Sequence, residues 1–238
     1  MSFTINHLGQ NCFYFNMDGF KLLIDPYFSD SCEAVSSANF KFIRRTPVFI
    51  PADEIDADFV YCTHDHLDHL DPETIPHIKN ATFAGPSSCA EHYKKLGLED
   101  SRIKVLDRGE SMEINGCKLT SVYAEHTPDS CGLIIEYDGK KVYNVGDGVL
   151  SDKLFDSKDM NIDLILVPIN GKLGNLNPEE AARLSKELKV KAAVPCHYDM
   201  FADNSEDPEK FNALLKGTGI RYLPLELNRE YEIEELLI

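Results

Sequence analysis

The sequence predicts a mixed α/β fold in which helices pack on the outer faces of β-sheets. At three places before residue 146, an Asp-Gly or Asn-Gly pair lies between short apolar or aromatic runs, which is typical of hairpins. Beyond residue 160, short apolar runs alternate with segments of helical periodicity. No linker-like stretch interrupts the 238 residues, so we expect one domain over 1–238.

The strands follow from turn chemistry and from apolar runs. An Asp-Gly or Asn-Gly pair accepts the positive φ that a tight turn between antiparallel strands requires. Continuous apolar runs without polar alternation predict interior strands that are covered on both faces. The predicted hairpins span 11–25, 110–124 and 131–146, and the predicted interior strands span 58–62, 163–169 and 191–196.

Helix signals fall between the predicted strands. Asn177 offers an N-cap, Pro178 suits the first helical position, and Glu180 completes a capping box before apolar residues at helical spacing. The predicted helices begin at Asn177-Pro178, at Asp207-Pro208 with Gly217 as its stop, and at Ser87 with its end at Gly97.

Charge and composition exclude several classes of partner. The formal net charge is −16, and such a surface repels phosphate backbones and anionic headgroups, so we expect no nucleic acid and no membrane as partner. There is no run of 18 apolar residues, and the first ten residues lack a signal-peptide pattern, so we expect a cytoplasmic protein. The seven cysteines form no C-x-x-C motif and predict reduced, buried thiols.

The segment most informative about chemistry is 62–69, with the sequence CTHDHLDH directly after an apolar run. It supplies three imidazoles and a carboxylate in the pattern H-x-H-x-D-H, and these groups are preferred ligands of zinc, manganese and iron. In an extended segment His64 and His66 point to the same side, while a following turn brings Asp68 and His69 toward a second position. The spacing is therefore suited to two metal ions.

This pattern resembles the signature of the metallo-β-lactamase-fold superfamily of metal-dependent hydrolases. In that superfamily the H-x-H-x-D-H loop is followed by a lone His, a Gly-Asp and a last His, each at a strand end. The sequence has all three in that order, as His126, Asp147 and His197. The resemblance implies a four-layer αββα sandwich, with two sheets face to face and helices on both outer sides.

The resemblance also implies two divalent metal ions. Because the implied ligand set has no thiolate, Zn and Mn are the main candidates, and Fe is also accepted. Cys62 and Cys196 directly precede ligand positions, but strand alternation aims them away and predicts core packing. The implied ligands are His64, His66 and His126 for one ion, Asp68, His69 and His197 for the other, and Asp147 as a bridge.

Further segments match one branch of the superfamily. They are Leu8-Gly9-Gln10 with Phe13, Ile24-Asp25-Pro26-Tyr27 with Ser29-Asp30, residues 63–72 (THDHLDHLDP), and His197-Tyr198-Asp199 followed by Asn204 and Asp207-Pro208. These segments resemble the L-ascorbate-6-phosphate lactonase-like branch. The established lactonases of that branch are considerably longer, so the resemblance does not carry over a particular substrate.

The metal pair predicts a hydrolytic mechanism. Two divalent ions about 3.5 to 4 Å apart share a water and lower its pKa toward about 7, which provides hydroxide at neutral pH. We expect this metal-bridging hydroxide to open an ester, a lactone or a related small anionic substrate. Asp68 is expected to orient the hydroxide as well as to hold a metal. Asp199 or Tyr198 is a candidate to protonate the leaving group, with an ordinary structural role as the alternative.

Three residues outside the ligand set also have two interpretations each. Asp25 ends an apolar run before a proline, and it either hydrogen-bonds a ligating imidazole, which fixes the tautomer, or serves as a turn residue. Arg44 and Arg45 lie in the long loop from Ser29 to Pro51. They either pair with an anionic substrate or form a solvated pair of charges.

The sequence leaves alternative functions open. A phosphodiesterase, nuclease or thioesterase of the same fold is one, although the negative charge disfavours a nucleic-acid substrate. A non-hydrolytic metal-binding protein similar to the flavodiiron group is another, but that group has Glu where His66 stands and is joined to a flavin domain. A scaffold that had lost the chemistry would lack ligands, and the sequence retains all of them.

Overall fold

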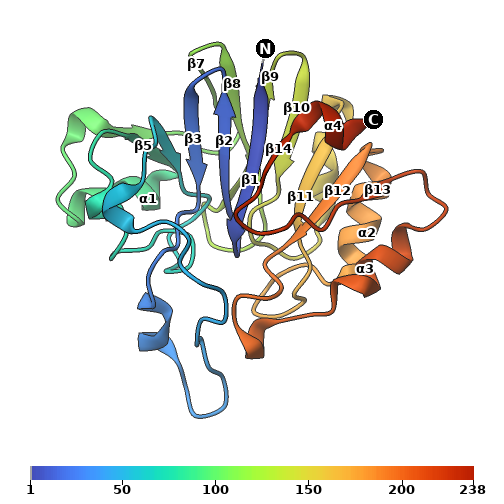
Figure 1. The fold of residues 1–238 in the computed structure, drawn as a ribbon, viewed down its shortest axis with the longest axis horizontal. Coiled ribbons are helices and arrows are strands. Elements are labelled where there is room, and N and C mark those ends of the chain that lie inside the picture. The colour runs from blue at the N-terminus through green and yellow to red at the C-terminus, as the bar shows by residue number, and fades with distance from the viewer. Residues whose placement is uncertain (1) are drawn as a thin grey trace.

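The structure is a computed structural model that describes residues 2–238, and its strands form two sheets that face each other (Figure 1). In spatial order, the first sheet contains β14 (Glu230–Glu232), β1 (Phe3–Gly9), β2 (Cys12–Met17), β3 (Phe20–Ile24), β4 (Phe59–Tyr61), β5 (Thr82–Gly85) and β6 (Ile103–Val105). The second contains β13 (Arg221–Tyr222), β12 (Ala192–Cys196), β11 (Leu164–Pro168), β10 (Lys140–Asn144), β9 (Cys131–Tyr137), β8 (Cys117–Tyr123) and β7 (Ser111–Ile114).

The two sheets repeat one pattern of strand directions. In the first sheet, β14, β1, β2 and β3 are antiparallel neighbours, and β3, β4, β5 and β6 run parallel. In the second, β7, β8, β9 and β10 are antiparallel, and β10, β11, β12 and β13 run parallel. The chain therefore has a doubled architecture that no repeated residue pattern in the sequence reveals.

The predicted hairpins and interior strands are confirmed. Tight turns join β2 to β3, β7 to β8, and β9 to β10, and the predicted interior runs form β4, β11 and β12. Both residues of each turn pair have positive φ, as the sequence pairs require. The φ values are 49° and 97° at Asp18-Gly19, 48° and 76° at Asn115-Gly116, and 49° and 71° at Asp138-Gly139.

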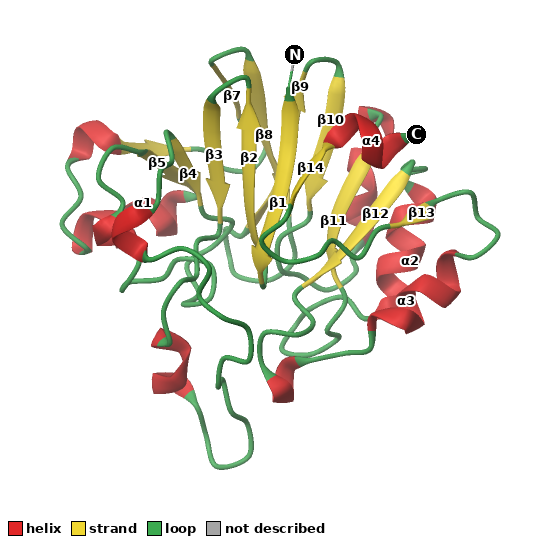
Figure 2. Ribbon diagram, viewed as in Figure 1, coloured by secondary structure: helices red, strands yellow, loops and turns green. Residues whose placement is uncertain are grey.

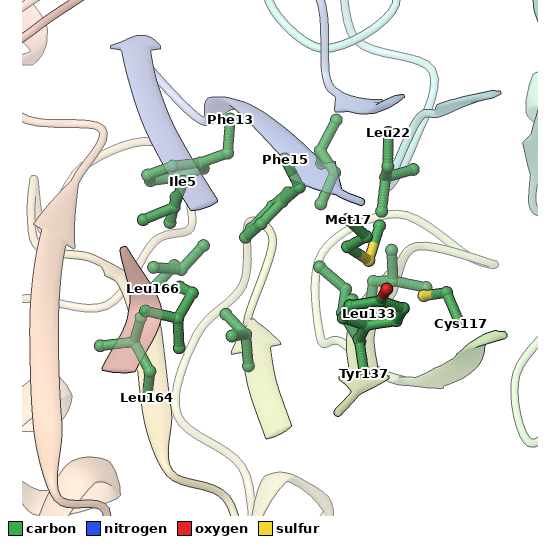
Figure 3. Close-up of a cluster of buried hydrophobic side chains, with 14 of the residues drawn as sticks. Ile5, Phe13, Phe15, Met17, Leu22, Cys117, Leu133, Tyr137, Leu164 and Leu166 are labelled. Atoms are coloured by element: carbon green, nitrogen blue, oxygen red, sulfur yellow. The ribbon is translucent and has the colours of Figure 1, made fainter. Parts of the chain in front are cut away.

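Alternate side chains of facing strands fill the space between the sheets (Figure 3). Phe13 of β2 points into this core from the first sheet, and Leu164 and Leu166 of β11 point into it from the second. Ile165 and Val167 point the other way, toward the helices. Because both faces of β11 are covered, its sequence is apolar throughout.

Helices cover the outer faces of both sheets, which confirms the four-layer αββα sandwich (Figure 2). The first sheet packs against α1 (Ser87–Lys95) through Cys89 and Tyr93. The second packs against α2 (Pro178–Glu187) and α3 (Pro208–Leu215). The short α4 (Ile233–Leu237) follows β14 and adds Ile233 to the core between the sheets.

The helix starts also agree with the sequence. Asn177 and Glu180 form the predicted capping box of α2, with Asn177 Oδ1 accepting from the Glu180 N–H at 2.9 Å. Asp207 caps α3 by accepting from the Glu209 N–H at 3.0 Å. Across residues 2–238, no helix combines the length and the apolar character needed to cross a bilayer.

The carboxyl ends of several strands, among them β1, β3, β4, β10 and β12, meet at one edge of the sandwich, the lower edge in Figure 1. The long loop 31–51 extends beyond this edge and lies against the loop that follows β12 (Figure 1). An isolated bridge pairs Arg44 with Phe201, and the Arg45 N–H donates to the Met200 carbonyl oxygen at 2.9 Å. The 31–51 loop is thus docked beside the edge where the predicted ligands emerge.

Candidate metal centre

Seven side chains converge at this edge, from the loop after β4 and from single positions after β8, β10 and β12. Within each of three groups, the potential ligand atoms lie within 4.8 Å of one another. The fold therefore brings together every ligand position predicted from the sequence. The groups are His64, His66 and His126; His64, His69 and Asp147; and Asp68, His69 and His197.

Residues with left-handed backbone lie just past the strand ends that form the site. The φ angle is 45° at Asp25 and 59° at His197, a conformation that costs about 1–3 kcal/mol in residues other than glycine. Gly146 also has positive φ, and a Cβ atom there would lie 2.8 Å from the Cys131 carbonyl oxygen. The turn that presents Asp147 therefore requires glycine.

A buried carboxylate orients the imidazole of His69. Asp25 Oδ2 lies 2.7 Å from His69 Nδ1, and Asp25 also accepts from the N–H and hydroxyl groups of Thr63 at 2.7 and 2.8 Å. Because a carboxylate only accepts, His69 Nδ1 carries a hydrogen, and Nε2 is the ring atom that faces the cluster. This contact matches the first of the two roles that the sequence analysis gave to Asp25.

Oxygen atoms orient two further imidazoles in the same way. Thr63 Oγ1 donates its one hydrogen to Asp25, so it accepts from His64 Nδ1, which lies 3.1 Å away. The carbonyl oxygen of Gly174 lies 3.2 Å from His126 Nδ1 and accepts there. In both rings Nε2 then faces the cluster: that of His126 lies 3.2 Å from His66 Nδ1, and that of His64 has no hydrogen-bond partner.

The cluster contains lone pairs with no hydrogen-bond donor to satisfy them. Within residues 2–238, the buried atoms His64 Nε2 and Asp147 Oδ1 are among those with no hydrogen-bond partner. Buried nitrogen and carboxylate oxygen atoms in this arrangement fit divalent cations, which accept several lone pairs at once.

In the absence of cations, protons bound to some of the imidazoles offset the close approach of these nitrogen and carboxylate oxygen atoms. Burial, together with the neighbouring His69, lowers the pKa of His64 well below 6.5. Burial also lowers the pKa of His197, but the carboxylates of Asp147 and Asp68 outweigh this effect and raise it to about 9. The cluster therefore mixes neutral and protonated rings, and cation binding must displace protons from it.

Amide side chains hold the two carboxylates of the cluster. Gln10 Nε2 donates to Asp68 Oδ2 at 2.7 Å, and Asn175 Nδ2 donates to Asp147 Oδ2 at 2.9 Å. The sequence analysis gave neither amide a role in the site, and Gln10 entered it only as part of a resemblance. A single Gln or Asn after a strand forms no recognisable sequence motif. Only the fold therefore reveals these contacts.

A cavity of about 390 Å³ lies beside the cluster, which is a size suited to a small molecule. Asp68, His126, Asp147 and His197 are part of its lining. The 31–51 loop forms another part of the lining and closes the cavity on that side. A ligand in this cavity contacts the potential metal ligands directly.

Neither arginine that the sequence analysis offered for substrate binding lines this cavity. The Arg44 side chain is 7% exposed and donates to the carbonyl oxygens of Tyr27 and Ser29 at 3.0 and 2.8 Å. Its guanidinium also stacks on the Tyr27 ring. Arg45 is half exposed and lies 3.6 Å from Asp199. Arg44 therefore anchors the 31–51 loop, because its planar fork matches backbone carbonyl groups.

The two candidates for protonating a leaving group also lie away from the cavity. Asp199 is exposed and faces Arg45, and Tyr198 packs against the core under α2 and α3, where burial raises its pKa. Both line a separate cavity of about 70 Å³ on the other side of His197. His197 has a left-handed backbone with a φ of 59°, and the two residues that follow it line this second cavity and not the one beside the cluster.

The fold and the His and Asp cluster together define a metal-dependent hydrolase with the metallo-β-lactamase fold. The chain belongs to this superfamily, since the family described as Beta-lactamase superfamily domain matches residues 4–197.

Individual relatives agree with this assignment. A UPF0173 metal-dependent hydrolase from Methanopyrus kandleri is 28% identical over 244 residues, which covers 96% of this chain and 99% of the relative. A metallo hydrolase from Ignicoccus hospitalis has a TM-score of 0.80 at 21% identity, with 98% and 100% of the two chains covered. An isothiocyanate hydrolase from Delia radicum gut bacteria has a TM-score of 0.80 at 19% identity, with 97% and 99% covered. The two structural comparisons show the shared fold.

Proposed function

We propose that the chain is a dinuclear metal-dependent hydrolase of an ester, a lactone or a related small acyl substrate. The observation that carries the proposal is the convergence of seven His and Asp side chains, with unpaired lone pairs, beside a cavity of about 390 Å³. Two divalent cations, with Zn and Mn as the main candidates, supply an ionised water at neutral pH and polarise the oxygen of the scissile group.

The proposed ligands form two sets on either side of Asp147, and these sets are His64, His66 and His126, and Asp68, His69 and His197. Asp147 contacts both sets, because its Oδ2 atom lies 3.8 Å from His126 Nε2 and 3.2 Å from His197 Nε2. This position suits it to hold two cations together. Asp68 lines the cavity and can accept a hydrogen bond from the attacking water, while Gln10 fixes the orientation of its carboxylate. No side chain is needed as a covalent nucleophile.

The leaving group of such a substrate has to take up a proton. The placement of Tyr198 and Asp199 around another cavity does not support either as the proton donor. In a lactone the leaving alkoxide stays attached to the acyl product but still has to take up a proton, and the proton that the attacking water releases can supply it. A screen of lactones, phosphorylated sugars, thioesters and phosphodiesters, each with zinc and with manganese, separates the acyl hydrolase from a phosphodiesterase of the same fold.

The central test removes potential ligands one at a time. We expect His66→Ala and Asp147→Ala to lose bound metal and hydrolytic activity together while the far-UV circular dichroism spectrum stays unchanged, because each truncation removes a ligand without touching the core. Metal content is measured by mass spectrometry of the purified proteins. His77→Ala, at an exposed histidine outside the cluster, is the control and should retain both metal and activity. Full turnover by a metal-free variant would refute the proposal.

A further inference from the structure

The cavity beside the cluster has an apolar side. Val35 and Phe42 line it from the long 31–51 loop, Leu67 lines it from the ligand loop, and Leu173 lines it from the loop after β11. In the part of the chain that the structure describes, no lysine or arginine belongs to the lining. Apart from the histidines of the cluster and cations bound to them, the lining therefore offers no positive group to an anionic substrate.

Three cationic side chains of the surrounding loops make their contacts outside the cavity. Arg44 donates to backbone carbonyl groups, and Arg45 faces a neighbouring carboxylate. Lys172 Nζ donates to the carbonyl oxygen of Asp203 at 2.8 Å. Asp65 lines the cavity and adds a negative charge to it. A carboxylate or phosphate on the apolar side would lose water without gaining a partner.

Leu173 occupies a position that suits a different residue type. Its φ angle is 54°, a left-handed conformation that a bulky side chain rarely adopts, and the residue is 56% exposed. Asparagine or glycine would fit this backbone better, and a polar side chain would suit the exposure. The next residue, Gly174, holds His126 Nδ1, so this turn lies directly against the cluster. A strained, exposed leucine at a cavity indicates contact with a ligand.

We propose that the part of the substrate remote from the scissile bond is neutral and apolar, such as a short hydrocarbon chain, and packs against Val35, Phe42 and Leu173. This inference rests on the proposed hydrolase function and specifies its substrate class. It replaces the anionic substrate that the sequence analysis expected from Arg44 and Arg45. The reacting group lies at the His and Asp cluster, and the chain extends along the apolar side of the cavity.

The test compares two ligands that differ only at the end remote from the metal-binding group. Hexanohydroxamic acid ends in a methyl group, and the monohydroxamic acid of adipic acid has the same number of carbon atoms but ends in a carboxylate. Calorimetry measures the affinity of each for the zinc-loaded protein near neutral pH. We expect the methyl-ended compound to bind about tenfold or more tightly, because its far end needs no ionic partner.

A variant at Leu173 separates ligand contact from stability. Leu173→Asn suits the left-handed backbone, so we expect a thermal midpoint at or above that of the wild type. The preference for the methyl-ended ligand should nevertheless fall to about twofold or less, because an apolar contact is lost. Val105→Thr is the matched control: Val105 is 48% exposed at the end of β6, outside the cavity, and this variant should keep the full preference.

The outcomes distinguish this inference from the proposed function. Equal affinities, tighter binding of the carboxylate-ended compound, or no binding of either compound would overturn the inference. Hydrolysis is assayed separately with the nitrophenyl esters of hexanoic acid and of adipic acid. Discrimination between the hydroxamic acids without hydrolysis of any ester, lactone or thioester counts against the proposed function alone. Hydrolysis of both nitrophenyl esters with equal kcat/KM retains the function and overturns the inference.

Discussion

At the scale of single residues, Asp25 determines where several neighbouring side chains carry their hydrogens. Its carboxylate, which is fully buried, accepts from the Thr63 N–H and hydroxyl groups, from Asn11 Nδ2 at 2.6 Å and from His69 Nδ1. Through Thr63 it also fixes the hydrogen of His64 Nδ1. One side chain thus prepares two imidazoles of the cluster to bind cations.

We expect Asp25→Asn to weaken metal binding about 10- to 100-fold, because an amide cannot accept at every position where the carboxylate now accepts. Asparagine tolerates the positive φ at this position, so the fold should be retained. A titration against a coloured chelator measures the affinity. Asp18→Asn, at a hairpin residue with φ of 49°, is the control and should bind metal normally. Unchanged affinity in Asp25→Asn would contradict the role assigned to it.

His7 provides a pH-dependent contribution to stability that is separate from the seven-residue cluster. Burial lowers the pKa of His7 from 6.5 to about 4, although its contact with the Gln10 carbonyl oxygen acts in the opposite direction. The unfolded chain therefore binds a proton below pH 6.5 that the folded chain does not bind until about pH 4. The stability that a neutral His7 contributes is complete above pH 6.5 and is lost as the pH falls toward 4.

From this difference we expect His7 to account for about 2 kcal/mol of the loss in unfolding free energy between pH 7 and pH 5. Between pH 7 and pH 5, the unfolding free energy of His7→Gln should therefore fall by about 2 kcal/mol less than that of the wild type. Urea unfolding of both proteins at the two pH values measures the difference, and groups that the two proteins share cancel. An identical loss in both proteins would show that His7 is protonated in the folded state.

At the scale of elements, the site depends on two loops that are fastened to each other beyond the sheet edge. The 31–51 loop has little secondary structure, yet Arg44 binds it to residues 27–29, and its bridge to Phe201 joins it to the loop after β12. Lys41 adds a third contact, from its N–H to Asp203 Oδ2 at 2.7 Å. These contacts keep Phe42 and Val35 at the cavity.

We expect Arg44→Met to loosen this loop without affecting metal content, since methionine retains an unbranched apolar stem but has none of the guanidinium's donors. Limited chymotrypsin digestion should then cleave after Phe40 and Phe42 several-fold faster than in the wild type. Arg45→Met is the matched control, because Arg45 is half exposed and pairs only at 3.6 Å with Asp199. Equal cleavage of the two variants would show that Arg44 does not anchor the loop.

At the scale of the whole molecule, the ligand cluster joins the two sheets. His64, His66, Asp68 and His69 follow β4 of the first sheet, whereas His126, Asp147 and His197 follow strands of the second. Two backbone hydrogen bonds connect the same parts, from the Cys131 N–H to the Thr63 oxygen at 2.9 Å and from the His197 N–H to the Gln10 oxygen at 3.0 Å. Bound cations would therefore link the two halves of the sandwich.

This arrangement predicts that cations stabilise the fold by mass action. With free zinc at a thousand times the dissociation constant, the free energy of unfolding should rise by about 4 kcal/mol above that of the chelator-treated protein. Differential scanning calorimetry over a series of zinc concentrations measures the effect. Asp147→Ala should show little dependence on zinc, and a wild-type midpoint independent of zinc would contradict the prediction.

Local patterns in the sequence predicted the hairpins, the interior strands, three helices and the H-x-H-x-D-H loop, and the family resemblance implied the three later potential ligands His126, Asp147 and His197. Turn pairs, apolar runs and the H-x-H-x-D-H spacing are visible within a few residues. Local patterns did not predict α4 or the strands β1, β5, β6, β13 and β14, since these elements are stabilised by pairing and packing with other segments. The roles of Gln10 and Asn175 were missed for the same reason.

The sequence by itself determined the class of fold and the chemistry of the ligands, because residue type and spacing set which groups can bind cations. Only the tertiary structure decided what surrounds those ligands. It turned Arg44 into an anchor, placed Tyr198 and Asp199 at another cavity, and brought Leu173 to the one beside the cluster. The physical reason is that the surroundings of a site depend on contacts between segments far apart in the chain, which no local pattern encodes.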